Sequence, residues 1–381
     1  MHRDIFTDEH ELFREQFRRF ARDEIAPKIA QWNAEGRSDR ASWKRMGEEG
    51  FLGPNAPEEY GGAGADFLYS AIVMEEMAYL RAHGLMASLH SDICMPYITE
   101  YGTDEQKAKY LPGAIGGDCL LGICMTEPGT GSDLQNVQTR ARRDGDDWVL
   151  DGSKTFISNG QIADLFIVVA KTDANVPGHK GISLFLVEAG SPGFRRGKKL
   201  DKLGLPGQDT SEIFFEGCRV PAASLLGREG QGFSMLMNKL QQERLSIAVM
   251  SIASCRRSFD DTLAYVKERT AFGRPIGSFQ NTQFTLADLA TQIEVGQAFV
   301  DRLLVAHVRG DAIVSEVSMA KWWTTELQKR VASECLQLFG GYGFMTEYPI
   351  SGDYADAAVQ TIYAGTNEIM KVIIARQLGL G

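Results

Sequence analysis

The spacing of hydrophobic residues changes twice along the chain, and this limits the fold more than any other feature of the sequence. Over the first ~120 residues, Phe13, Phe17 and Phe20 recur at helical spacing. Thr7 can cap the first helix, because its hydroxyl can accept from a free backbone N–H at the helix start. Pro27 stops or kinks this helix, since proline lacks a backbone donor. We therefore expect a helical N-terminal region.

Short runs of β-branched and aromatic residues replace the helical spacing in the middle of the chain. The clearest runs span residues 148–150, 164–170, 182–187 and 212–215. Asp144-Gly145 and Asp151-Gly152 are turn signals on either side of the first run. Because such turns favour hairpins over parallel crossovers, an antiparallel sheet is predicted here.

Helical spacing returns near Gly232 and lasts to the end of the chain. The apolar positions that trace one helical face are Leu245, Ala248, Ile252, Phe259, Leu263 and Val266. Further helices are expected over 282–307 and 313–339, and Gly340-Gly341 should end the second of them. Thr366 can cap a last helix that runs through residue 378. Long helices without charge-dominated heptads predict a bundle.

Together these regions predict an α+β chain with three domains. The predicted domains are N-terminal helical (1–121), middle antiparallel β (122–230) and C-terminal helical bundle (231–381). The net charge of −10 and the lack of a long basic run argue against nucleic-acid binding. Scattered cysteines without a Cys-x-x-Cys pair argue against a disulfide framework or a zinc site. No apolar stretch approaches the ~18 residues of a membrane span, so we expect a cytoplasmic enzyme that is not membrane-bound.

The densest motif is Thr126-Glu127-Pro128-Gly129-Thr130-Gly131-Ser132-Asp133. Its proline and glycines favour a tight loop, which exposes backbone N–H groups beside hydroxyls and carboxylates. Such a loop can hold a phosphate or the polar edge of a ring, although an ordinary turn before a strand explains it equally well. No Rossmann pattern surrounds the loop, so a nicotinamide site is not indicated.

Three further segments could bind a ligand. Phe156 and Ser158 fall on one side of a strand, where an aromatic ring and a hydroxyl could meet a flat cofactor. Arg269, before a Gly-Arg-Pro break, suits a phosphate. The glycines of the Gln337–Phe344 segment would let a ligand or another chain approach the backbone. A strand end, a surface arginine and a helix C-cap are the structural alternatives for the three segments.

Taken in the order in which they occur along the chain, the four motifs resemble those of the acyl-CoA dehydrogenase family, and the resemblance covers nearly the whole chain. The shared segments are Thr-Glu-Pro-Gly-x-Gly-Ser-Asp, Arg-x-x-Phe-Gly-x-Pro-Ile-x-x-Phe-Gln and Gln-x-Phe-Gly-Gly-Tyr-Gly-Phe. The resemblance implies a helical N-terminal domain, a β domain and a C-terminal four-helix bundle. It also implies FAD as cofactor, an acyl-CoA substrate, an electron-transferring flavoprotein as acceptor, and a homotetramer built as a dimer of dimers.

The resemblance also implies which residues contact FAD. The flavin ring would meet Ile123, Met125, Thr126, Gly131 and Ser132 on one side, and Phe156 and Ser158 on the other. The pyrophosphate and adenosine would meet Arg269, Phe272 and Gln280, together with Gln337, Leu338, Gly340 and Gly341 from a neighbouring subunit. Thr366 and Glu368 would complete the site at a helix N-terminus. The implied substrate contacts are Ser132, Gln241, Arg244, Ala364 and Gly365.

The position of the catalytic base departs from the common family pattern. Many members carry a glutamate in a Tyr-Glu-Gly-Thr motif, where this chain has Tyr363-Ala364-Gly365-Thr366. A minority place it on the first helix of the C-terminal domain, and Glu243 falls at that position, followed by Arg244. Glu243 is therefore the expected base. Ala364 keeps its backbone N–H, which can still polarise a thioester carbonyl.

The segments around Leu89-His90-Ser91 and Gln242-Glu243-Arg244-Leu245 most resemble the long-chain enzymes of the family. Fatty acyl-CoA β-oxidation is therefore the expected context. His90 could line the acyl tunnel or be a packed histidine. A branched short-chain enzyme of the isovaleryl type, an acyl-CoA oxidase, a non-enzymatic acyl-CoA sensor and a carrier-protein substrate remain alternatives.

Overall fold

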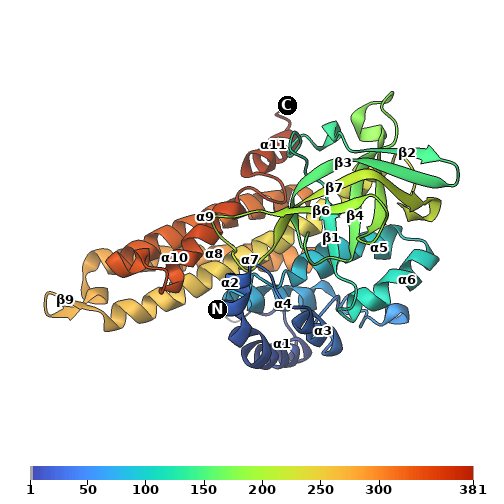
Figure 1. Cartoon of the computed structure of the whole chain (residues 1–381). Coiled ribbons are helices and arrows are strands. Elements are labelled where there is room, and N and C mark those ends of the chain that lie inside the picture. The colour runs from blue at the N-terminus through green and yellow to red at the C-terminus, as the bar shows by residue number, and fades with distance from the viewer. Residues whose placement is uncertain (1–2, 381) are drawn as a thin grey trace.

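The computed structural model describes residues 3–380, and a β region separates two helical regions along the chain (Figure 1). The N-terminal helices are α1 (Asp8–Phe20), α2 (Ile29–Glu35), α3 (Arg40–Glu48), α4 (Phe67–Leu80), α5 (Met95–Tyr101) and α6 (Asp104–Ile115). Thr7 caps α1 as predicted, and its hydroxyl accepts from the N–H of His10. Phe17 and Phe20 are buried in the core of this region. Regular helix ends at Phe20, before Pro27, which lies in the 3₁₀ turn Ala26–Lys28.

The middle region is a mixed sheet with strand order β6-β7-β3-β2-β4-β5-β8, and β1 pairs with β4. Its strands are β1 (Leu121–Cys124), β2 (Arg140–Asp144), β3 (Asp147–Ser158), β4 (Leu165–Lys171), β5 (Ile182–Glu188), β6 (Phe194–Lys199), β7 (Thr210–Pro221) and β8 (Leu225–Leu226). The Asp144-Gly145 signal is confirmed as the turn of the β2–β3 hairpin. The Asp151-Gly152 prediction is wrong, because these residues lie inside β3 at a register shift against β7. A Cβ on Gly152 would lie 2.5 Å from Thr139 Oγ1, so close approach, not a turn, requires the glycine.

The prediction of an antiparallel sheet is correct for most pairs but wrong for β1. β1 pairs with β4 in parallel, with Leu121 opposite Leu165 and Cys124 opposite Val168. One further parallel bridge joins Arg140 of β2 to Lys171 of β4. Apolar residues of α5 and α6 pack against one face of β1 and β4, and a second apolar cluster of the β region buries the other face, as is typical of parallel strands. Turn signals report only connections between neighbouring strands, so they could not predict this distant pairing.

The C-terminal bundle consists of α7 (Gly232–Glu268), α8 (Gln280–Val308), α9 (Val314–Phe339), α10 (Pro349–Gln360) and α11 (Asn367–Gln377). A short pair of strands, β9 (Thr270–Ala271) and β10 (Arg274–Pro275), joins α7 to α8 at the end of the bundle remote from the sheet (Figure 1). The predicted apolar face of α7 lies in the bundle core, with Leu263 partly buried. Gly340 ends α9 at φ 60°, and Thr366 caps α11, both as predicted. The sequence analysis did not predict α10, although Pro349 marks its first turn.

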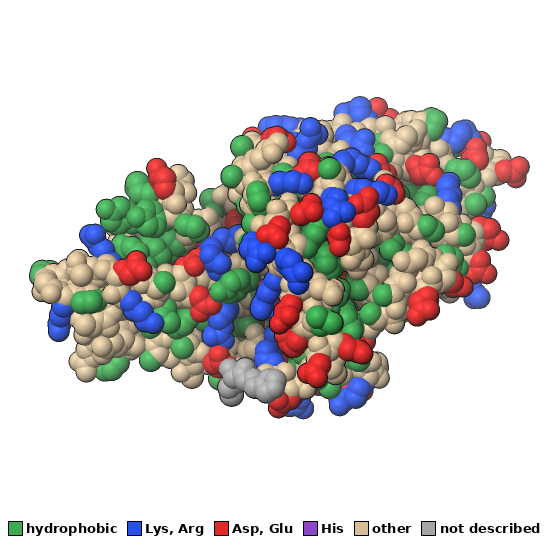
Figure 2. Space-filling view, turned by 90° about the horizontal axis from the view of Figure 1, so that it is seen from below, with side chains coloured by type: hydrophobic (Ala, Val, Ile, Leu, Met, Phe, Trp, Pro, Cys, Tyr) green, Lys and Arg blue, Asp and Glu red, His purple; other side chains and the backbone are tan. Residues whose placement is uncertain are grey.

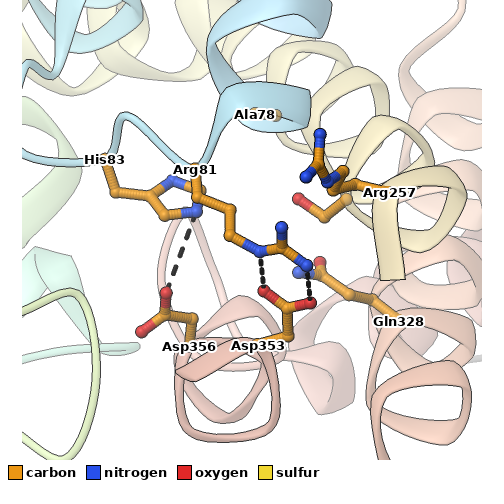
Figure 3. Close-up of a pocket in the computed structure, with 8 residues that line it drawn as sticks. Ala78, Arg81, His83, Arg257, Gln328, Asp353 and Asp356 are labelled. Carbon is orange, nitrogen blue, oxygen red and sulfur yellow. Dashed lines mark hydrogen bonds and ion pairs between the residues drawn. The ribbon is translucent and has the colours of Figure 1, made fainter. Parts of the chain in front are cut away.

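Ion pairs and hydrogen bonds join the three regions (Figure 3). Arg81, which follows α4, donates two hydrogen bonds of 2.6 Å to Asp353 of α10. Next to this pair, His83 Nε2 lies 3.8 Å from Asp356, which also accepts from the backbone N–H of Leu205 in the loop before β7. Basic and acidic side chains also line the groove between the N-terminal helices and the bundle, seen from below in Figure 2. Among residues 3–380, no helix is both long and apolar enough to cross a membrane.

Asp353→Ala tests the junction in Figure 3. The side chains of Arg81 and Asp353 are only 18% and 12% exposed, so the substitution removes the bidentate partner of a partly buried guanidinium, which keeps only its 2.9 Å ion pair with Asp261. We expect the free energy of unfolding, measured with urea, to fall by about 3 kcal/mol. Glu229→Ala is the control. It breaks the ion pair between Arg143 and Glu229, whose side chains are 55% and 45% exposed, and it should change the free energy of unfolding by less than about 0.5 kcal/mol. If the two variants lowered the free energy of unfolding equally, the pair of Arg81 and Asp353 would not stabilise the contact between the N-terminal region and the bundle.

Candidate active site

Glu243 is a buried carboxyl on α7, and only 4% of the residue is exposed. It packs against the N-terminal region, where the hydroxyl of Tyr97 on α5 donates a hydrogen bond of 2.9 Å to Glu243 Oε1. Tyr97 is itself fully buried. The first helix of the bundle and a helix of the N-terminal domain therefore fix this carboxyl between them.

The surroundings of Glu243 raise its pKa to about 7, chiefly because burial removes water from the ionised form. The Tyr97 hydrogen bond and the charges of Arg244 and Lys239 act in the opposite direction and lower the pKa. A carboxyl that changes its protonation near neutral pH can take up and release a proton under physiological conditions. Glu243 therefore has the properties of a general base or acid.

Arg244, the next residue, is 5% exposed, and its Nε is buried without a hydrogen-bond partner in the described part of the chain. Burial lowers the pKa of its guanidinium, although the neighbouring Glu243 raises it. Gln241 is engaged at both ends of its amide, because it accepts from Ile313 N and donates to the carbonyl of Asp311. Of these predicted substrate contacts, Arg244 has unused donor capacity and Gln241 does not.

The loop at Ala364 is held in an unusual backbone conformation between α10 and α11. Ala364 has φ 52° and Gly365 has φ 91°, and the left-handed region is unfavourable for alanine. Lys321 of α9 donates a hydrogen bond of 2.8 Å to the carbonyl of Gly365. Burial, followed by the charge of Arg244, lowers the pKa of Lys321 to about 8. The charge of Arg244 thus acts on both Glu243 and the lysine that holds the Ala364 loop.

The Thr126 loop rests on a buried ion pair in the β region. Lys154 Nζ donates to Glu127 Oε1 at 2.9 Å and to the carbonyl of Met125 at 3.1 Å. Glu127 also accepts from Thr139 N at 2.9 Å, and its pKa is lowered by Lys154 and these hydrogen bonds despite its burial. The backbone at Met125 and Thr126 is therefore fixed, while open space surrounds the Cα positions of Gly129 and Gly131.

Phe156 and Ser158 lie beside this loop, because Thr155 N donates to the carbonyl of Thr126 at 2.9 Å. Phe156 is 66% exposed and Ser158 is half-buried, whereas Ile157 between them is buried. Phe156 has φ 58° at a register shift of β3 against β7, where strand alternation is interrupted, so a shared side for the two side chains stays a prediction. An exposed aromatic ring next to a polar loop with a fixed backbone fits a flat cofactor with a polar edge.

The predicted contacts with the pyrophosphate and adenosine lie far from this loop within one chain. Arg269, Phe272 and Gln280 surround β9 and β10, at the end of the bundle remote from the sheet (Figure 1). The Gly340–Phe344 segment lies at the same end, where the Arg269 guanidinium is 5.4 Å from the centre of the Tyr342 ring. Phe272 is 96% exposed, and Figure 2 shows hydrophobic side chains on this arm of the molecule. One chain therefore brings the predicted contacts together in two separate groups, and Thr366 caps α11 near the sheet.

No sequence pattern predicted a role for Tyr97, Lys154 or Lys321. Tyr97 and Lys321 belong to regular helical patterns, so their sequence positions gave no sign of their partners. Lys154 stands in a strand two residues before Phe156, and a fully buried lysine becomes visible only in the folded chain. His90 is a packed histidine in this structure. It is fully buried and forms hydrogen bonds with Ala114 O and Leu121 N.

The raised pKa of Glu243 makes a testable prediction about stability. Because its pKa in the folded chain exceeds the ordinary value of 4.5, its contribution to the free energy of unfolding is fully present below about pH 4.5 and is lost as pH rises through about 7. Glu243→Gln removes the buried charge, so at pH 8 the variant should be more stable than the native chain, on the order of 3 kcal/mol. At pH 4.5 the two proteins should differ little. Urea unfolding at both pH values, at equal flavin content, measures this, and a pH-independent difference would contradict the raised pKa.

Comparison with known proteins agrees with this architecture. Sequence profiles of the acyl-CoA dehydrogenase family match residues 7–118 (N-terminal domain), 122–218 (middle domain) and 230–379 (C-terminal domain). The mitochondrial long-chain specific acyl-CoA dehydrogenase of Mus musculus is 51% identical over 99% of this chain and 88% of its own length. The mitochondrial isovaleryl-CoA dehydrogenase of Pongo abelii is 37% identical over 97% of this chain and 88% of its own. The crystal structure of an acyl-CoA dehydrogenase from Geobacillus kaustophilus superposes with a TM-score of 0.98 at 51% identity, covering 99% of this chain and all of that one. The chain belongs to the acyl-CoA dehydrogenase family.

Proposed function

We propose that this chain is an FAD-dependent enzyme that removes one hydrogen from the α carbon and one from the β carbon of a fatty acyl-CoA. The product would be the trans-2-enoyl-CoA. The observation that carries the proposal is the buried Glu243 carboxyl, whose pKa of about 7 suits a base at neutral pH. The alanine at position 364 supports this placement, because it leaves the Ala364 loop without a carboxylate of its own.

In this mechanism, Glu243 takes the α proton of the substrate. The Tyr97 hydroxyl already donates to Glu243 Oε1, so it stabilises the carboxylate form that is ready to accept the proton. Burial by α5 and α7 excludes water, which strengthens the electrostatic interactions of the carboxylate. FAD, when bound, supplies the acceptor for the β hydrogen.

Acidity at the α carbon depends on the thioester carbonyl. A donor aimed at this oxygen stabilises the charge that develops when the α proton leaves. The backbone N–H of Ala364 is the proposed donor. Lys321 binds the carbonyl of the following residue, Gly365, in the same loop. Arg244, with its free buried Nε, Ser132 and Gly365 are further proposed contacts, and Gln241 would contribute by holding α7 to the α8–α9 connection.

The cofactor is proposed on both the family and the residues present. A glutaryl-CoA dehydrogenase from Mycobacterium smegmatis, solved in complex with FADH2, superposes with a TM-score of 0.91 at 29% identity. In this chain, Met125, Thr126 and Phe156 would hold the flavin ring. The Arg269 and Gly340 group lies remote from them, so we infer that a neighbouring subunit supplies it, in a homotetramer. The 96% exposure of Phe272 supports burial against another copy.

The long-chain substrate is proposed on the 51% identity to the Mus musculus enzyme, and a branched short-chain substrate is the alternative. Anaerobic bleaching of the flavin by acyl-CoAs of increasing length distinguishes the two.

An electron-transferring flavoprotein is the proposed acceptor, and fast reoxidation of the reduced enzyme in air would instead indicate an oxidase. The proposed domains are 1–121, 122–230 and 231–381. The cytoplasmic location stays a prediction, since the Mus musculus relative is named as mitochondrial.

Glu243→Gln tests the assignment of the base. Glutamine keeps an acceptor for Tyr97 but cannot take a proton, so we expect kcat to fall by at least about 10³-fold. The flavin spectrum should be unchanged, because Glu243 is not among the proposed FAD contacts. Glu216→Gln, on the exposed part of β7, is the matched control and should keep full activity. Full activity of the Glu243 variant would refute the assignment.

The pH dependence gives a second test. In the native chain, kcat/KM should rise with pH through a midpoint near 7, as Glu243 ionises. Tyr97→Phe removes the hydrogen bond that lowers the pKa of Glu243, so the midpoint should move to higher pH. Tyr110→Phe removes a hydroxyl that donates to Glu188 at the surface, and it should leave the profile unchanged. An unchanged midpoint in the Tyr97 variant would contradict a base under the control of Tyr97.

A further inference from the structure

Lys321 is a fully buried lysine in the middle of α9, and it lies outside all the proposed contacts with substrate and FAD. Its ammonium donates to the carbonyl of Gly365 at 2.8 Å and to Asn367 Oδ1 at 3.1 Å. No carboxylate forms a direct ion pair with it among residues 3–380, and only the more distant charges of Glu368 and Glu326 raise its pKa. A buried ammonium without a direct ion-pair partner costs free energy of folding. The presence of Lys321 at this position therefore needs a structural or functional reason, and its hydrogen bonds to the 365–367 segment suggest one.

The segment that Lys321 holds is strained and would otherwise be free to relax. Ala364 occupies the left-handed region at φ 52°, which is unfavourable for a residue with a Cβ. Strained residues persist only where their surroundings hold them in place. Gly365, directly after the strained residue, is the residue whose carbonyl Lys321 binds.

Asn367 anchors the same segment to α9 a second time. Its side chain, 1% exposed, donates to Thr325 Oγ1 at 3.1 Å and to Glu326 Oε1 at 2.9 Å. Lys321, Thr325 and Glu326 lie about one turn apart on the same helix. One face of α9 therefore fixes the backbone on the C-terminal side of Ala364.

We propose that Lys321, with Asn367, is a positioning residue that aims the backbone N–H of Ala364 at the thioester carbonyl. The inference rests on the proposed function, in which this N–H polarises the carbonyl while Glu243 removes the α proton. Lys321 is not among the proposed substrate contacts, and it acts through the Gly365 carbonyl and the two peptide units that lead back to the Ala364 N–H. Because a donor displaced by about 1 Å can cost about 10²-fold in rate, the tether has a direct effect on turnover.

The test uses the purified full-length enzyme with bound flavin and ¹³C-carbonyl-labelled 3-thiadodecanoyl-CoA, a thioester without a β C–H bond. Its carbonyl stretching band in the infrared falls in frequency when a donor polarises the oxygen. The variant is Lys321→Met, which keeps the length of the side chain but has no donor. The matched control is Lys371→Met, an exposed lysine on α11.

In the native enzyme and the Lys371 control, the carbonyl band of the bound ligand should lie below that of the free ligand. In Lys321→Met, the band should return toward the free value, and kcat should fall by about 10²-fold with a smaller change in KM. Asn367→Ala, which removes only one anchor, should shift the band in the same direction and provides the test if Lys321→Met does not fold. A native-like band in either well-folded variant would overturn the positioning role. An unshifted band in the native enzyme would instead contradict the proposed N–H contact at Ala364.

Discussion

The site depends on the burial of one carboxyl between two domains. Glu243 lies on α7 and its partner Tyr97 on α5, so the carboxyl keeps its raised pKa only while the N-terminal helices pack against the bundle. Desolvation is the largest cause of this shift, and it exceeds the opposing effects of Tyr97, Arg244 and Lys239. The docking of the two helical regions is thus both a matter of stability and the source of a base that works near neutral pH.

Two buried lysines hold the backbone of the two loops that we propose contact the cofactor and the substrate. Lys154 fixes the carbonyl of Met125 beneath the Thr126 loop, and Lys321 fixes the carbonyl of Gly365. In both places a buried ammonium binds a main-chain oxygen on a loop that we propose contacts the cofactor or substrate. Only Lys154 has a carboxylate partner, Glu127. The absence of such a partner for Lys321 in the described chain agrees with a role in holding the loop.

Local signals in the sequence predicted what depends on neighbouring residues. The caps at Thr7 and Thr366 and the stop at Gly340 follow from single-residue chemistry, and all three are confirmed. The parallel pairing of β1 with β4 was not predictable from turns, because it joins strands separated by a complete hairpin. The turn prediction at Gly152 is wrong, because a glycine can mark either a turn or a close approach between two chain segments. Here Gly152 is required by its close approach to Thr139. Glu243 was singled out by resemblance, but its partner Tyr97 is a tertiary contact that no local pattern encodes.

The most direct test of the account is the exchange of α hydrogens between a bound thioester and D₂O, because this step needs the base but no net oxidation. Proton NMR of 3-thiadodecanoyl-CoA incubated with the enzyme measures the rate. The native enzyme should catalyse the exchange, and Glu243→Gln should slow it by at least about 10³-fold. Equal exchange rates for the two proteins would contradict Glu243 as the residue that removes the α proton.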